Sequence, residues 1–122
     1  MGYQIITKMR YNAETKHIET WQHSNNVYPR TDEFYAKDVS SDEQMFEFIK
    51  FIATGVWQGR KWKKKFNILF REYPELQRET YINELMGKTW AEYSAICRKY
   101  DELAQSKYKE IVARFRQLTN IR

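Results

Sequence analysis

Residues 56–71 read VWQGRKWKKKFNILFR, and this segment separates two parts of the chain that differ in residue pattern. Before it, apolar and polar residues alternate in short runs, which is typical of half-buried β-strands. After it, apolar residues recur every three or four positions, which is typical of helices. The sequence therefore predicts an α+β fold, in which a small N-terminal antiparallel β-meander is followed by a helical half.

The meander is expected to contain about three strands. Residues 3–11 and residues 17–23 alternate as two strands, joined by a turn. Asn12 favours that turn because its side chain can bond to its own backbone. Residues 27–36 offer material for a third strand, although Pro29 interrupts it because proline cannot donate a ladder hydrogen bond.

The helical half is expected to begin with a capping box made by Ser40 and Glu43. Gly55 or Gly59 is then expected to end the first helix. The apolar residues that recur at helical spacing in this helix are Met45, Phe48, Ile49, Ile52 and Val56.

The basic segment itself predicts an amphipathic helix that runs to about residue 73. Its apolar stripe has residues four, three and four positions apart, so that one side can face the core. Pro74 is expected to open a further short helix, which Gly87 ends. The apolar stripe of the basic helix consists of Trp62, Phe66, Leu69 and Tyr73.

Residues 90–118 predict one long C-terminal helix. Thr89 and Glu92 form a second capping box, and no glycine or proline interrupts the segment. The near-heptad apolar seam is expected either to pack within the fold or to pair with a second copy in a homodimer. This seam consists of Tyr93, Cys97, Tyr100, Ala104, Tyr108, Ile111, Phe115 and Leu118.

The 122 residues are expected to form a single domain, with residues 1–39 as the meander subdomain and residues 40–122 as the helical subdomain. One cysteine excludes an intramolecular disulfide, and no apolar run reaches the roughly 18 residues of a membrane helix. The first residues lack the pattern of a signal peptide. We therefore expect a cytoplasmic protein that does not bind a membrane.

The positive charge of the chain is concentrated in one place. Residues 56–73 contain six basic residues and one acidic residue, and this excess equals the net charge of +5 of the whole chain. Phosphates attract lysine and arginine, and bases stack on aromatic rings, so this mixture favours contact with nucleic acid or a nucleoprotein. The expected binding residues are Trp57, Arg60, Lys61, Lys63, Lys64, Lys65 and Arg71, with Trp57 as the stacking residue.

Two other interpretations of the basic segment remain open. In one, the charges form a solvated outer side of a helix and have no partner. In the other, the chain is an inhibitor or adaptor that binds a host protein, for example a defence nuclease such as a CRISPR effector. In size and composition the chain resembles small accessory proteins of phages and mobile elements in low-GC bacteria, which is compatible with this second interpretation. A role as a DNA mimic is disfavoured because such mimics are acidic.

The sequence contains no defensible catalytic motif, and we expect neither enzymatic activity nor a cofactor. A metal site at His17, Glu19 and His23 is disfavoured because two strand residues six positions apart lie roughly 20 Å from each other. Cys97 is expected to be a small buried apolar residue. The enzymatic alternative is a metal-independent ribonuclease that uses His23, Tyr28, Arg30 and the lysine cluster.

Overall fold

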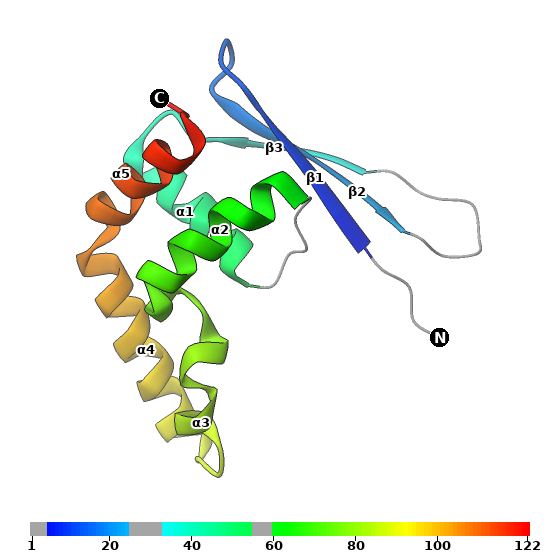
Figure 1. Ribbon diagram of the computed structural model, residues 1–122. Helices are drawn as coiled ribbons and strands as arrows, with labels where there is room; N and C mark the ends of the chain where they lie inside the picture. The colour runs from blue at the N-terminus through cyan, green and yellow to red at the C-terminus, as the bar shows by residue number, and fades with distance from the viewer. Residues whose placement is uncertain (1–4, 25–32, 55–59) are drawn as a thin grey trace.

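The computed structural model describes residues 5–24, 33–54 and 60–122 and confirms the α+β fold. Three strands pair in the order β1-β2-β3, and both pairings are antiparallel. The helices follow the sheet in the sequence and gather at one end of it (Figure 1). The strands are β1 (Ile5–Asn12), β2 (His17–Ser24) and β3 (Glu33–Asp38).

The hairpin between β1 and β2 forms as the sequence predicts. The Asn12 side-chain oxygen accepts hydrogen bonds from the backbone amides of Glu14 and Thr15, at 3.0 and 3.3 Å. Lys16 completes the turn with a φ of 60°. The third predicted strand, residues 27–36, overlaps the observed strand only in part, because β3 extends to Asp38. Pro29 lies outside the described residues.

Helix α1 (Asp42–Ala53) begins one residue later than the sequence predicts. Ser41, and not Ser40, is the N-cap, and its partner in the capping box is Gln44 instead of Glu43. The Ser41 hydroxyl oxygen accepts from the Gln44 amide at 3.1 Å, and the Gln44 side-chain oxygen accepts from the Ser41 amide at 3.1 Å. The first helix was predicted to end at Gly55 or Gly59, and both glycines lie outside the described residues.

After α2 (Arg60–Glu72) the chain is less regular than predicted. In place of one short helix, two single turns of 3₁₀ helix precede a four-residue helix. Pro74 stands at the first position of the first turn, as expected, and Gly87 follows the short helix with a φ of 70°. These elements are η1 (Pro74–Leu76), η2 (Arg78–Tyr81) and α3 (Ile82–Leu85).

The predicted long C-terminal helical segment consists of two consecutive helices, α4 (Trp90–Ser106) and α5 (Tyr108–Thr119). Lys107 between them has a φ of −111° and a ψ of 11°, and the chain bends there (Figure 1). The Ser106 hydroxyl donates to the Leu103 carbonyl at 2.7 Å, a local bond of the type that bends helices. The predicted capping box of Thr89 and Glu92 is confirmed.

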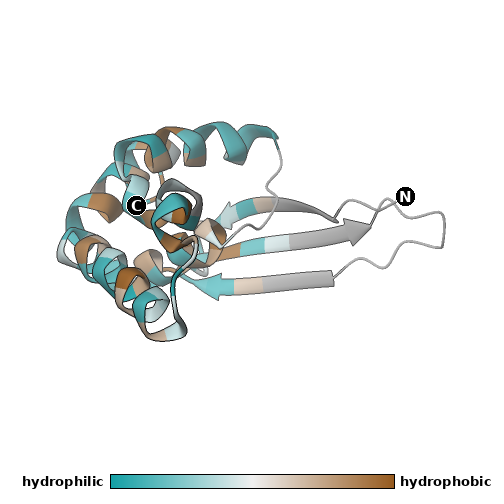
Figure 2. Cartoon of the chain, turned by 90° about the horizontal axis from the view of Figure 1, so that it is seen from below, coloured by the Kyte–Doolittle hydropathy of each residue, from teal (hydrophilic) through white to brown (hydrophobic). Residues whose placement is uncertain are grey.

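The core lies where α1, α2 and α5 meet the end of the sheet. Figure 2 shows hydrophilic and hydrophobic bands alternating along the helices, which is the pattern of helices with one buried side. Met9 and Ile18 from the sheet join this cluster, as do Val39 and Ile121. The largest fully buried side chains of the helices are Phe46, Phe48, Phe66, Phe115, Met45, Ile49, Ile52, Leu69 and Ile111.

Among the described residues, no helix is both long and apolar enough to cross a membrane.

Candidate nucleic-acid interface

The apolar stripe of α2 faces the core, as the sequence predicts. Phe66 and Leu69 are fully buried, and Trp62 and Tyr73 are partly buried against the same cluster. The Phe66 ring lies 5.3 Å from the Phe115 ring of α5, centroid to centroid. These contacts fix the rotation of α2 about its axis, and therefore determine which side chains face outward.

The outward side of α2, which we call the basic face, carries the predicted cations. Arg60, Lys61, Lys64 and Arg71 are exposed, and Lys63 and Lys65 are half-buried. The Lys65 amine lies 6.0 Å from the centroid of the Trp62 ring, so this long side chain packs over the apolar stripe. Trp57, the predicted stacking residue, lies outside the described residues.

The structure does not bring all the predicted residues to one place. Arg60 and Lys61 stand at the start of α2 and Arg71 at its end, roughly 17 Å along the axis. Lys64 and Lys65 follow Lys61 by three and four positions, so both are neighbours of Lys61 on the helix surface. The compact part of the basic face is therefore its N-terminal half.

A hollow of about 480 Å³ lies beside this N-terminal half, between β1, α2 and the end of α5. Four of the residues that line it are cationic, and none carries a carboxylate. We call it the basic hollow, and its cationic residues are Arg10, Arg60, Lys61 and Lys65. The other lining residues are Met9, Tyr11, Trp62, Thr119, Asn120 and Ile121.

Arg10 was not among the predicted binding residues, because β1 is about fifty residues before α2 in the chain. Its guanidinium also forms an ion pair with Glu19, its partner on β2. That hydrogen bond from Arg10 is the main reason why the pKa of Glu19 lies below its usual value. No sequence pattern identifies Arg10, because the fold brings it to α2: the Trp62 indole of α2 donates to the Met9 carbonyl oxygen of β1, next to Arg10.

The start of α2 is electrostatically unusual. The first turn contains no acidic residue, although the partial positive charge of a helix N-terminus favours carboxylates there. Instead it contains Arg60, Lys61 and Lys63. The only acidic residue of α2, Glu72, accepts a hydrogen bond of 2.6 Å from Arg114 of α5 at the opposite end. An anion bound near the start of α2 would offset this accumulation of positive charge.

The residues considered for metal binding form no metal site in the described part of the chain. No group of three histidine, cysteine, aspartate or glutamate side chains there could hold a metal ion. His17 contacts the Thr15 carbonyl oxygen, at 2.9 Å from Nδ1. The structure does not describe Tyr28, Arg30 or the side chain of His23, so the ribonuclease alternative remains a prediction.

The predicted seam of residues 90–118 is buried mainly in its second half. Ile111 and Phe115 of α5 belong to the core, and Tyr108 packs against it. In α4 only Ala104 is buried, and Cys97 is half-buried, not buried as expected. The α5 half of the seam is therefore occupied within the fold, and a homodimer through this segment would have to use α4.

The structure thus brings Arg60, Lys61 and Lys65 together with Arg10 around one hollow, with Lys64 on the adjoining surface. Arg71 lies apart from this group, at the other end of α2. Comparisons of the chain with protein-family models, with curated proteins and with solved structures found no match.

Proposed function

We propose that the protein is a non-enzymatic binding module that contacts nucleic acid, or the nucleic acid of a nucleoprotein, through the N-terminal half of the basic face. The observation that carries the proposal is the basic hollow, in which four cationic side chains and no carboxylate surround one concavity. A phosphate group is the anion that such a cluster suits, because arginine and lysine neutralise it and donate hydrogen bonds to it.

The arrangement favours backbone contact over the reading of bases. Lys61 and Lys64 are exposed neighbours on α2, and such side chains follow a phosphate backbone without regard to sequence. The basic hollow would hold one phosphate group while these two lysines contact the groups next to it. Affinity should therefore depend steeply on salt and weakly on sequence.

A salt series of fluorescence anisotropy measurements tests the proposal, with labelled single-stranded DNA, duplex DNA and RNA as probes. The logarithm of the affinity for at least one probe is expected to fall linearly with the logarithm of the salt concentration. The informative variant is the double charge reversal Lys61→Glu and Lys64→Glu, which changes two exposed residues and should leave the fold intact.

The matched control reverses Lys88 and Lys109, which are exposed and lie outside α2. Both double variants lower the net charge by the same amount, so any difference between them reflects location. The α2 variant is expected to lose at least about tenfold in affinity and to show a smaller salt slope. Equal losses in the two variants, or no binding to any probe at low salt, would contradict the proposal.

Binding to a host protein is the second candidate function, and one observation favours it. Met86 and Trp90, at the junction of α3 and α4, are 72% and 79% exposed. Tryptophan is enriched among the residues that dominate protein interfaces. A protein complex that survives the Lys61→Glu and Lys64→Glu changes, and that Trp90→Ser disrupts, would favour this second function over the first.

A further inference from the structure

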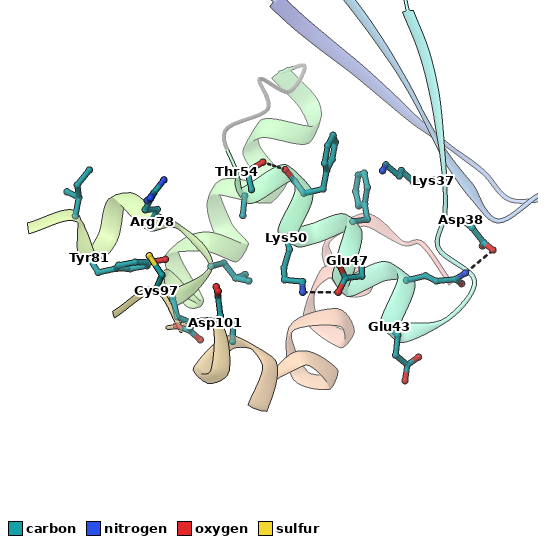
Figure 3. Close-up of a pocket in the computed structure, with 18 residues that line it drawn as sticks. Lys37, Asp38, Glu43, Glu47, Lys50, Thr54, Arg78, Tyr81, Cys97 and Asp101 are labelled. Carbon is teal, nitrogen blue, oxygen red and sulfur yellow. Dashed lines mark hydrogen bonds and ion pairs between the residues drawn. The ribbon is translucent and has the colours of Figure 1, made fainter. Parts of the chain in front are cut away.

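A cleft of about 980 Å³ separates α1 from the segment that runs from η1 to α4. Figure 3 shows Glu47 and Lys50 of α1 on one side of it and Tyr81, Cys97 and Asp101 on the other. It is about twice as large as the basic hollow and does not share a residue with it. We call it the acidic cleft.

Both walls of the acidic cleft expose large apolar side chains. Phe51 on the α1 wall is 39% exposed, and Ile82 on the opposite wall is 48% exposed. Buried aromatic residues, Phe48 and Tyr81, line the cleft as well. A concave surface with apolar walls and polar groups at its edge has the usual composition of a binding site.

The charge of the acidic cleft is opposite to that of the chain. Its lining contains five acidic and three basic residues, a balance of −2, in a protein of net charge +5. The acidic residues are Asp38, Glu43, Glu47, Glu75 and Asp101, and the basic residues are Lys37, Lys50 and Arg78.

The basic groups of the cleft are already engaged. The Lys50 amine forms an ion pair of 2.8 Å with Glu47, and the Lys37 amine lies 4.7 Å from the centroid of the Phe51 ring. The Arg78 guanidinium lies 4.8 Å from the centroid of the Tyr93 ring. Each of these three cations therefore already contacts a carboxylate or an aromatic ring of the protein.

The acidic groups are less well neutralised. The Asp101 side chain is exposed and makes no hydrogen bond or ion pair within the described part of the chain. Glu43 accepts one hydrogen bond, from the Tyr108 hydroxyl at 3.3 Å. Glu75 is buried and forms an ion pair of 3.3 Å with the Lys107 amine, so Asp101 and Glu43 are the carboxylates that matter for a ligand. The field in the cleft therefore favours a cation.

We infer that the acidic cleft binds an amphipathic, basic peptide segment of a partner protein. Apolar side chains of the segment fill the space between Phe51 and Ile82, and its lysine or arginine side chains approach Asp101 and Glu43. Apolar burial contributes affinity, and the carboxylates select a positively charged segment. This site is separate from the basic hollow, so the inference does not depend on the proposed function.

The probe is a fluorescein-labelled helical peptide of about twelve residues, with leucine at positions i, i+3, i+4 and i+7 and lysine elsewhere. A second peptide has glutamate in place of every lysine. Fluorescence anisotropy is expected to show binding of the lysine peptide and at least about tenfold weaker binding of the glutamate peptide. Attraction by net charge would give the opposite order, because the whole chain is positive.

Two pairs of variants locate the binding. Asp101→Lys and Glu102→Lys change neighbouring exposed residues of α4 and the net charge equally, but only Asp101 lines the cleft. Ile82→Ser and Ile68→Ser remove similarly exposed isoleucines, and only Ile82 lines the cleft. The first member of each pair is expected to weaken binding of the lysine peptide at least about fivefold, and the second to leave it unchanged.

Cys97 gives an independent readout, because it is the only cysteine of the chain and lines the cleft. Saturating lysine peptide is expected to slow the reaction of Cys97 with a thiol reagent. No binding of the lysine peptide, equal binding of the glutamate peptide, equal effects within a variant pair, or an unchanged thiol reaction rate would each overturn the inference. The Lys61→Glu and Lys64→Glu variant should bind the peptide normally, so failure of this site and failure of the proposed function can be told apart.

Discussion

The indole nitrogen of Trp62 donates a hydrogen bond of 2.7 Å to the backbone carbonyl oxygen of Met9. This bond joins the first turn of α2 to β1, two elements that are far apart in the sequence. It holds Arg60 and Lys61 of the helix beside Arg10 of the strand, and these residues line the basic hollow. One partly buried hydrogen bond therefore positions cations from two elements.

Replacing Trp62 by phenylalanine is expected to lower the free energy of unfolding by about 1–3 kcal/mol, because the Met9 carbonyl loses its donor and the ring loses volume. Urea unfolding followed by circular dichroism measures the change. Trp90→Phe is the matched control, since Trp90 is highly exposed, and it is expected to change stability by less than about 0.5 kcal/mol. Equal losses in the two variants would contradict this account of the bond.

The N-cap of α1 gives a prediction that separates two adjacent serines. Ser41→Ala is expected to cost about 1 kcal/mol, because the Gln44 amide loses the hydroxyl that caps it. Ser40→Ala removes a hydroxyl that donates to the Gln44 side chain at 2.9 Å and caps no amide, so it is expected to cost less than half as much. Thermal unfolding of both variants measures the difference, and the reverse order would place the cap at Ser40.

Tyr73 is expected to contribute to the loss of stability at high pH. Burial, and secondarily its 2.6 Å hydrogen bond to Glu110, raise its pKa from 10.0 to about 12. The folded state therefore favours the neutral phenol, a contribution that is complete below pH 10 and is lost as the pH rises through about 12. Tyr73→Phe should lose less stability than the wild type over this interval, as measured by urea unfolding at each pH.

The two curves share every lysine and every other tyrosine, so their difference isolates Tyr73. The pKa values of Tyr81 and Tyr100 are also raised, by burial and by a hydrogen bond to Glu84 respectively. They remain in both proteins and cancel in the comparison. Parallel curves for the wild type and Tyr73→Phe between pH 10 and 12 would show that Tyr73 makes no such contribution.

The ion pair at the bend between α4 and α5 gives a further prediction. Lys107→Met is expected to destabilise the protein by about 1–3 kcal/mol, because it leaves the buried Glu75 carboxylate without its cation. The partial exposure of Lys107 keeps the expected loss below that of a fully buried pair. Lys109→Met, at an exposed position two residues later, is the control and should be nearly neutral.

A double-mutant cycle completes this test. Glu75→Gln removes the charge that Lys107 neutralises, so adding Lys107→Met to it should cost less than Lys107→Met costs alone. Additive losses in urea unfolding would show that the two side chains are not coupled across the 3.3 Å that separates their charged atoms.

Local pattern was sufficient to predict much of the fold. The alternation in residues 3–11, the turn at Asn12 and the stripe of Phe66 and Leu69 each depend on residues that are close in the chain. Strand period and helix period are local properties, so a sequence displays them directly. The same holds for the basic face, which follows from the stripe once α2 is recognised.

Features that depend on distant residues could not be predicted in this way. Arg10 joins the basic hollow because strand register and the Trp62 bond bring β1 to α2, and no local pattern encodes that contact. Ser40 and Ser41 differ by one position, which pattern alone does not resolve. The bend at Lys107 was missed because no glycine or proline marks it.

The bend at Lys107 also separates two helices that are buried to different extents. Helix α5 buries Ile111, Val112 and Phe115, whereas α4 buries only Ala104. A helix with few buried contacts opens at low free energy even when a neighbour in the same chain stays closed. The amide hydrogens of α4 should therefore exchange with solvent through local opening, while those of α5 wait for the protein as a whole to unfold.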